Sequence, residues 1–451
     1  MRMRGVCALA SATLTVLLAA PASAVQPPQV MIGAAPADPP PGPEQPYKQD
    51  KGCLGAGVLP HSDLSQPAPP DRALNLPRAR SLSRGGGVTV AVLDTGAGPN
   101  PRLPNLVGGG DYVQAGGDGL TDCDAHGTLI AGIIGAAPDQ ADGFTGVAPD
   151  ARIISIRVHS DTVSLANSVN YDLVQQEASD IRTLARAITH AANLGAGVIT
   201  VSEPVCVSVQ QPVDQSLLSE AIGYAVHVRG ALIVAGAGNT DGSVCDQNPD
   251  IDPGHPADPR NWEKVRTVST PGWFGSDVLT VGFTTADGEP MPDTLLGPWV
   301  SLAAPGTGIE SLGPGGGGLI NGVGEPDKLV PVAGSSFAAA YVSGVAALLR
   351  SRFPNETPAE ISARLLASAH APARELDNTI GAGVIDPVAA LGYHTPPAPP
   401  AGSYGGSPLA MPPQPRPKDW RPGGVAAGIM AAAVLLGSGV DIGRRMLRRS
   451  R

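Results

Sequence analysis

The chain has 451 residues, of which 42% are hydrophobic, enough for one large domain with appendages or for two ordinary domains. Its formal net charge is −10, and residues 25–422 alone carry about −16. The only basic cluster is a group of arginines after residue 443, so the charge distribution argues against a nucleic-acid-binding protein.

Residues 1–24 have the pattern of a secretory signal peptide. Arg2 and Arg4 supply the positive charge, an apolar run follows from Val6 to Ala20, and Ala22-Ser23-Ala24 is a small-x-small cleavage site. The alternative, a membrane anchor, is weaker because the apolar run is too short to span a bilayer comfortably.

The C-terminal end has the pattern of a membrane anchor. Residues 395–421 form a Pro-rich linker, and Gly423 to Val440 contains no charged residue. Five arginines follow within residues 444–451. We therefore predict a transmembrane helix over 422–443 with a basic cytoplasmic tail, and a chain body outside the cytoplasm. A buried core helix is the weaker alternative.

Four cysteines remain once Cys7 leaves with the signal peptide. An even number of cysteines in an exported chain predicts two disulfides, and the spacing leaves all three connectivities open. Buried free thiols are the alternative, and a zinc site is a poor one because no two cysteines lie close in sequence. Residues 25–84 precede the first clear strand and are predicted as an N-terminal extension, with a short helix over 71–82. The cysteines are Cys53, Cys123, Cys206 and Cys245.

Residues 85–394 alternate between apolar runs and amphipathic segments. Apolar strands separated by helices predict a parallel sheet covered on both faces, an α/β fold. Two polar stretches, 160–177 and 241–266, interrupt the pattern and are predicted as irregular surface insertions. The predicted strands are 88–93, 151–158, 198–202, 231–235, 278–281 and 300–303. The predicted helices are 126–136, 179–194, 215–229, 336–350 and 357–369.

Three residues of this body form a candidate catalytic set. Ser336 follows a Gly-Ser turn at a helix start, His126 begins an apolar helix, and Asp94 ends the strand 88–93. A serine hydroxyl needs an adjacent base, and the base needs a partner that fixes its tautomer. Asp94 lies at the carboxyl end of a strand, where ligands bind in open α/β sheets.

A fourth residue can complete such a site. The glycine-rich segment before Asn239 follows the strand 231–235, so the Asn239 amide can turn toward the nucleophile. Together with the backbone N–H of Ser336 it would form an oxyanion hole. Each motif alone is common, but the order Asp, His, Ser with all four at strand ends or helix starts is the order of subtilisin.

Over residues 85–393 the chain resembles the subtilisin-like serine peptidases. Asp94, His126, Asn239 and Ser336 match the four signature positions of that family. The resemblance implies a subtilisin-like fold, and it places Ser202 where the family pairs substrate backbone as an added strand. Calcium often stabilises subtilases, but this sequence contains no convincing calcium-binding loop, so we predict neither cofactor nor metal. An esterase on an α/β-hydrolase fold is disfavoured, because that fold has the order Ser, acid, His.

The flanking segments make the chain similar to the mycosins, membrane-anchored subtilases of type VII secretion systems. The resemblance implies an extracytoplasmic endopeptidase of narrow specificity that acts on protein substrates beside the membrane components of a secretion complex. It also implies the pairs Cys53–Cys123 and Cys206–Cys245, and an extension that wraps the body. The alternative is a structural subunit of the complex for which proteolysis is secondary.

Several residues depart from the pattern or could mislead. Ser335 stands where many subtilases have threonine and is expected to place its hydroxyl near the oxyanion. Glu203-Pro204 follows Ser202 in place of Leu-Gly, which favours basic or small substrate side chains. Asp122 and Asp124 precede His126 with metal-like spacing, but are predicted to be exposed and to favour the helix dipole. The lone histidines are predicted as surface or packed residues: His159, His190, His227 and His255.

Overall fold

The computed structural model describes residues 25–33, 35–166, 172–240, 245–316, 318–325, 328–395 and 397–398. The predicted signal peptide, transmembrane helix and basic tail lie outside these ranges, as does nearly all of the linker. None of the helices within these ranges has both the length and the apolar character that a membrane span requires.

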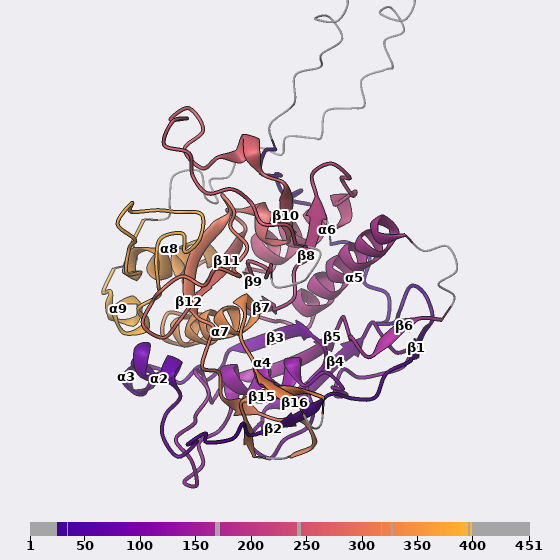
Figure 1. Ribbon diagram of the computed structural model, residues 1–451, viewed down its shortest axis with the longest axis vertical. Helices are drawn as coiled ribbons and strands as arrows, with labels where there is room; N and C mark the ends of the chain where they lie inside the picture. The colour runs from indigo at the N-terminus through magenta and orange to yellow at the C-terminus, as the bar shows by residue number, and fades with distance from the viewer. Residues whose placement is uncertain are drawn as a thin grey trace, which may run out of the picture. The chain divides into compact units, whose positions relative to one another are not determined.

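A parallel sheet of seven strands forms the centre of the fold, in the order β12-β11-β9-β7-β3-β5-β4 (Figure 1). Every neighbouring pair in it is parallel, which confirms the sheet predicted from the apolar runs. The strands are β3 (Thr89–Asp94), β4 (Leu106–Asp111), β5 (Arg152–Arg157), β7 (Val198–Val201), β9 (Leu232–Gly236), β11 (Val278–Thr284) and β12 (Val300–Pro305).

Helices cover both faces of this sheet. Side chains alternate along a strand, so in β3 Val90 and Val92 join one core while Ala91 and Leu93 join the other. The first core contains α4 (His126–Gly135) and α7 (Ser335–Arg352). The second contains α5 (Leu173–Asn193) and α6 (Ser216–Gly223). Up to residue 398, two further helices follow α7, namely α8 (Pro358–Ser368) and α9 (Pro387–Gly392).

One strand of the central sheet was not predicted, and one predicted helix has a different form. β4 was not predicted because its Leu-Val-Gly-Gly-Gly-Asp sequence reads as a loop, yet a Cβ at Gly109 would lie 2.3 Å from a methyl group of Ile154. Glycine is thus required there by the close approach of the neighbouring strand. The single helix predicted over 215–229 is α6 followed by a π-helical turn, η1 (Tyr224–Val228).

In their described residues, the first insertion is more regular than predicted, whereas the second is largely irregular, as predicted. Within 160–177, β6 (Val163–Leu165) forms a strand and α5 already begins at Leu173. Within 241–266, the buried side chain of Asn248 donates to the carbonyl oxygens of Thr267 and Leu296 and so fastens the insertion to the body. A 3₁₀ turn, η2 (Trp262–Lys264), follows.

The N-terminal extension runs over the surface of the body and pairs with it at several points. β1 (Tyr47–Gln49) pairs with β6, and β2 (Gly55–Gly57) pairs with β15 (Gly322–Glu325) next to β16 (Lys328–Pro331), as Figure 1 shows. The helix predicted over 71–82 is two short helices, α2 (Pro69–Ala73) and α3 (Leu76–Leu82). The remaining strands are β8 (Val205–Ser208), β10 (Thr267–Thr270), β13 (Ser311–Leu312) and β14 (Leu319–Ile320), and two further 3₁₀ turns are η3 (Gly272–Phe274) and η4 (Pro314–Gly316).

Candidate active site

The candidate residues gather at the carboxyl edge of the parallel sheet. Asp94 is the last residue of β3, Ser202 directly follows β7, and Asn239 lies three residues after β9. Parallel strands all end at the same edge, so these three side chains are brought together although they are far apart in sequence.

A hydrogen-bonded chain links Asp94, His126 and Ser336. His126 Nδ1 lies 2.8 and 3.1 Å from the two carboxylate oxygens of Asp94, and Nε2 lies 2.9 Å from Ser336 Oγ. A proton on Nδ1 serves the carboxylate and leaves Nε2 to accept from the serine hydroxyl. The ring of Phe337 packs against His126 with centroids 5.1 Å apart, which restricts rotation of the imidazole.

Local backbone geometry presents the histidine and the serine. Ala125 adopts a left-handed conformation, with φ of 64°, immediately before α4 begins at His126. Ser336 is the second residue of α7. The N–H groups of the first helical turn have no intrahelical acceptor. The Ser336 N–H can therefore donate a hydrogen bond to a ligand that lies next to the Ser336 hydroxyl.

The Asn239 side chain is held by the backbone that precedes the serine. Its Oδ1 accepts a hydrogen bond from Ser335 N at 3.0 Å, which fixes the orientation of the amide and makes Nδ2 the donor at its other end. A Cβ on Gly334 would lie 2.9 Å from this Nδ2, and Gly334 has a φ of 154° that side-chain-bearing residues rarely adopt. Both observations require glycine at position 334.

The Ser335 hydroxyl has a partner in the protein that the sequence did not indicate. Its buried Oγ accepts from Gly238 N at 3.0 Å. The hydroxyl thus fastens the glycine-rich turn before Asn239 to the start of α7, and Ser335 lines the same cavity as Asn239 and Ser336.

The charge of the His126 imidazole is controlled by the carboxylates around it. Burial alone would lower the pKa of His126, but the adjacent carboxylates of Asp94 and Glu203 outweigh it and raise the pKa well above its usual value. Asp94 is 0% exposed, and this burial would by itself raise its pKa. The charge and the hydrogen bond of His126 outweigh the burial, so the pKa of Asp94 is lowered. The Asp94 carboxylate is also held by Thr95 N at 2.7 Å.

The two aspartates before α4 are not exposed, so that prediction was wrong. Asp122 accepts from Thr128 N at 2.9 Å and from Thr95 Oγ1 at 3.0 Å, and burial raises its pKa to about 6. Asp124, buried beneath the loop after β5, accepts from Ser160 Oγ at 2.6 Å. Both carboxylates fix the loop that carries His126.

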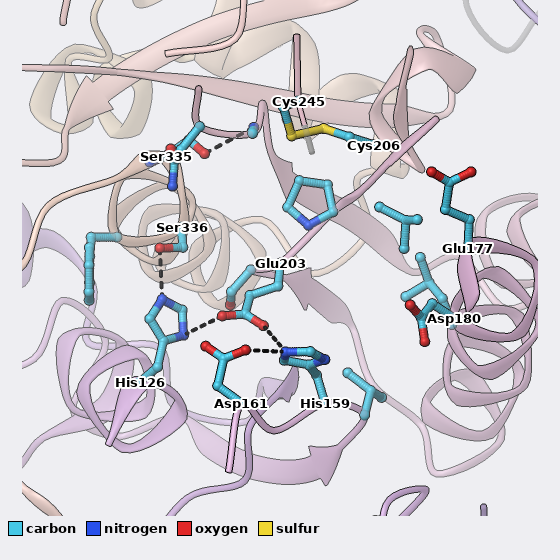
Figure 2. Close-up of a pocket in the computed structure, with 18 of the residues that line it drawn as sticks. His126, His159, Asp161, Glu177, Asp180, Glu203, Cys206, Cys245, Ser335 and Ser336 are labelled. Atoms are coloured by element: carbon cyan, nitrogen blue, oxygen red, sulfur yellow. Dashed lines mark hydrogen bonds and ion pairs between the residues drawn. A yellow bond between two sulfur atoms is a disulfide. The ribbon is translucent and has the colours of Figure 1, made fainter. Parts of the chain in front are cut away.

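A cavity of about 550 Å³ opens beside the hydrogen-bonded chain (Figure 2). His126, Ser336, Asn239 and Ser202 all line it, together with residues from the loops after β5 and β7 and from one side of α5. Ser202 is buried at its base. The predicted nucleophile, base, oxyanion donor and substrate-binding serine therefore all face the same cavity.

Sequence reasoning missed one member of this site. His159, grouped with the other lone histidines, lines the cavity and pairs with Asp161, with Nε2 and Oδ1 3.1 Å apart. The other three histidines pair with aspartates elsewhere, namely His190 with Asp38, His227 with Asp277 and His255 with Asp252. The signal for His159 was its place two residues after β5, at the same sheet edge as Asp94.

Both disulfides lie near the site. Cys53 of the extension is bonded to Cys123 in the loop before α4, and Cys206 of β8 is bonded to Cys245 of the second insertion. Cys206 and Cys245 also line the cavity, so the second disulfide forms part of its wall (Figure 2).

The sequence is related to a group of known proteins. Residues 85–383 match the subtilase family. Mycosin-3 of Mycobacterium tuberculosis is 48% identical over 427 residues, which cover 92% of each chain. Mycosin-1 of the same organism is 45% identical over 98% of this chain and 99% of its own.

Solved structures agree with these relatives. The crystal structure of MycP1 from Mycobacterium smegmatis superposes with a TM-score of 0.80 at 46% identity, over 83% of this chain and 97% of that one. A chain in the structure of an intact ESX-5 inner membrane complex has the same TM-score and identity, over 92% of this chain and 99% of that one. The chain therefore belongs to the subtilase family of serine proteases and, within it, to the mycosins.

Proposed function

We propose that this protein is a serine endopeptidase in which Ser336 is the nucleophile, His126 the general base and Asp94 the residue that orients and stabilises the imidazole. The observation that carries the proposal is the continuous hydrogen-bonded chain from the buried Asp94 carboxylate through His126 to Ser336 Oγ. Such a chain activates a hydroxyl that is a weak nucleophile on its own.

The reaction then follows from the geometry. Ser336 Oγ attacks the scissile carbonyl carbon while its proton passes to His126 Nε2, and the resulting imidazolium is stabilised by the Asp94 carboxylate on Nδ1. The oxyanion is received by the Ser336 N–H and by Asn239 Nδ2. His126 next protonates the leaving amine, and water hydrolyses the acyl-enzyme by the same route.

The proposed setting is the outer face of a membrane. Residues 1–24 would direct export, 25–84 form the extension, 85–394 the peptidase body and 395–421 the linker, while 422–443 anchor the chain by one helix and leave 444–451 in the cytoplasm. The related chain in the ESX-5 inner membrane complex supports assembly of this protein with membrane components of a type VII secretion complex. Its substrates would be proteins presented there, over a narrow range set by the cavity.

A second role is structural. The extension and the two insertions present additional surface around the body, which suits a subunit that stabilises a larger assembly. The complete set of Asp94, His126, Asn239 and Ser336 argues against a protein without catalytic function, but the two roles are compatible.

The first test uses purified full-length protein and its Ser336→Ala variant with a fluorophosphonate probe. Labelling of the wild type alone would support the assigned nucleophile, and absence of labelling in folded wild type would contradict it. A secretion assay in cells separates the roles: secretion that persists with Ser336→Ala favours the structural role, and its loss with normally inserted variant favours catalysis.

A further inference from the structure

The cavity continues past the catalytic histidine to a carboxylate that the reaction does not require. Glu203 Oε1 lies 3.7 Å from His126 Nδ1, and Glu203 Oε2 lies 4.0 Å from His159 Nε2. Figure 2 shows Glu203 between the two imidazoles, with its carboxylate facing into the cavity. Its side chain remains 34% exposed, so a ligand can reach it.

The opposite wall of the cavity is one side of α5. Leu173, Gln176, Glu177, Asp180 and Leu184 line it, at helical spacings of three or four residues along one face. The acids on this wall face the same space as Glu203 (Figure 2).

Apolar groups also line the cavity. They come from the end of β5, from α5, and from the loop and strand after β7, and they include the Cys206–Cys245 disulfide. The cavity therefore combines an apolar lining with carboxylates. A long aliphatic side chain with a cationic head matches this arrangement, because its methylene groups pack against apolar surface while its charge needs a polar or anionic partner.

The carboxylates of the cavity share their cationic partners with one another. Glu203 faces both His126 and His159, and the pKa of His159 is raised to about 9 by Asp161 and Glu203, although burial alone would lower it. Burial raises the pKa of Glu203, which the nearby histidines only partly oppose, and burial also raises the pKa of Asp180. Histidines are the only basic residues among the described side chains that line the cavity. The ammonium group of Lys51, in the extension, binds the backbone carbonyl oxygen of Asp161 at 3.0 Å. A cationic side chain of the substrate would therefore give these carboxylates an additional partner of opposite charge.

We propose that this cavity selects substrates with a lysine or arginine within two residues of the scissile bond, and that Glu203 is the residue that receives its charge. The position follows from the geometry, since only the imidazole of His126 separates Glu203 from Ser336. An extended substrate advances about 3.3 Å per residue, so the side chains that can reach this carboxylate are those within about two residues of the reacting carbonyl. The inference rests on the proposed function and specifies its substrate class.

The test compares fluorogenic peptides that carry lysine or Nε-acetyl-lysine at each position around the bond that full-length protein cleaves. Acetylation keeps the aliphatic stem and removes the charge. We expect a preference for lysine of about fivefold in kcat/KM at one position, near the upper end of what a partly exposed charge pair provides. Glu203→Gln should reduce this preference to below threefold, whereas Glu289→Gln, on an exposed residue outside the cavity, should retain it.

Binding of the same peptides to the Ser336→Ala protein, measured by fluorescence anisotropy, tests the inference without turnover. Tighter binding of the lysine peptide that depends on Glu203 supports it. Equal binding of the two peptides, or a lysine preference that survives Glu203→Gln, overturns it. Failure of the fluorophosphonate probe to label the wild type would instead contradict the assigned nucleophile, and the binding comparison would still decide the selectivity.

Discussion

Replacement of Gly334 by alanine is expected to impair catalysis more than it impairs folding. A new Cβ would lie 2.9 Å from Asn239 Nδ2, closer than real Cβ contacts allow. The amide is the end of a side chain, so it would yield first and move away from the oxyanion position. The φ of 154° adds backbone strain, because this region is open almost only to glycine.

The two effects have separate magnitudes. Loss of one oxyanion donor lowers kcat by roughly 10²–10³, which corresponds to about 3–4 kcal/mol of transition-state stabilisation. The backbone strain costs about 1–3 kcal/mol of folding stability. Gly195→Ala is a matched control, because Gly195 has a φ of 82° but no atom within 4 Å of the added Cβ. It should cost about 1 kcal/mol of stability and leave kcat unchanged.

Three measurements decide this prediction. They are kcat on a cleaved peptide, the free energy of unfolding from denaturant titration, and the double variant with Asn239→Ala. If Gly334→Ala acts through the amide, the double variant should be little slower than Asn239→Ala alone. Full additivity of the two losses, or a Gly334→Ala protein within threefold of wild-type kcat, would refute the reasoning.

Three further predictions concern charge and cross-links. The raised pKa of His126 means that kcat/KM should increase as pH rises and the imidazole loses its proton, and Glu203→Gln should shift this limb to lower pH in a pH–rate profile. Burial raises the pKa of Glu310 to about 7, so its contribution to stability is complete below about pH 4.5 and is lost as pH rises towards 7. Glu310→Gln should remove about 1–2 kcal/mol of this pH dependence, after allowance for solvent screening, and an unchanged unfolding profile would contradict the assignment. Joint replacement of Cys206 and Cys245 by alanine opens a loop of 39 residues and should lower the free energy of unfolding by about 4 kcal/mol, measurable by denaturant titration.

The parts of the fold that were predictable are those in which local pattern and tertiary environment agree. Strand β3 is apolar on both sides because it is buried on both sides, and it ends in an acid at the sheet edge. The glycines before Asn239 likewise predict a turn from the local sequence alone, and the serines at the start of α7 predict a helix start. These local signals are sufficient to place Asp94, His126, Asn239 and Ser336 at the correct edge of the sheet.

The parts that were not predictable depend on which strand lies beside which. His159 and Glu203 flank the active site because β5 and β7 are the two neighbours of β3, an order that the sequence does not state. The glycine-rich β4 has no strand propensity, and its pairing with β5 is a tertiary effect. Ser335 shows the same limit in one side chain, since a hydroxyl has many possible partners and only packing selects Gly238 N.

The pairing of the extension with β15 has a consequence for the order in which the chain acquires its structure. Residues 55–57 are among the first to be synthesised, yet their partner strand lies at residues 322–324. A protein made from its N-terminus must therefore hold this segment unpaired until most of the body exists. Once paired, the segment joins the beginning of the chain to its late part, so a cut directly after residue 57 would leave the N-terminal fragment tied to the body by this pairing and by the Cys53–Cys123 disulfide.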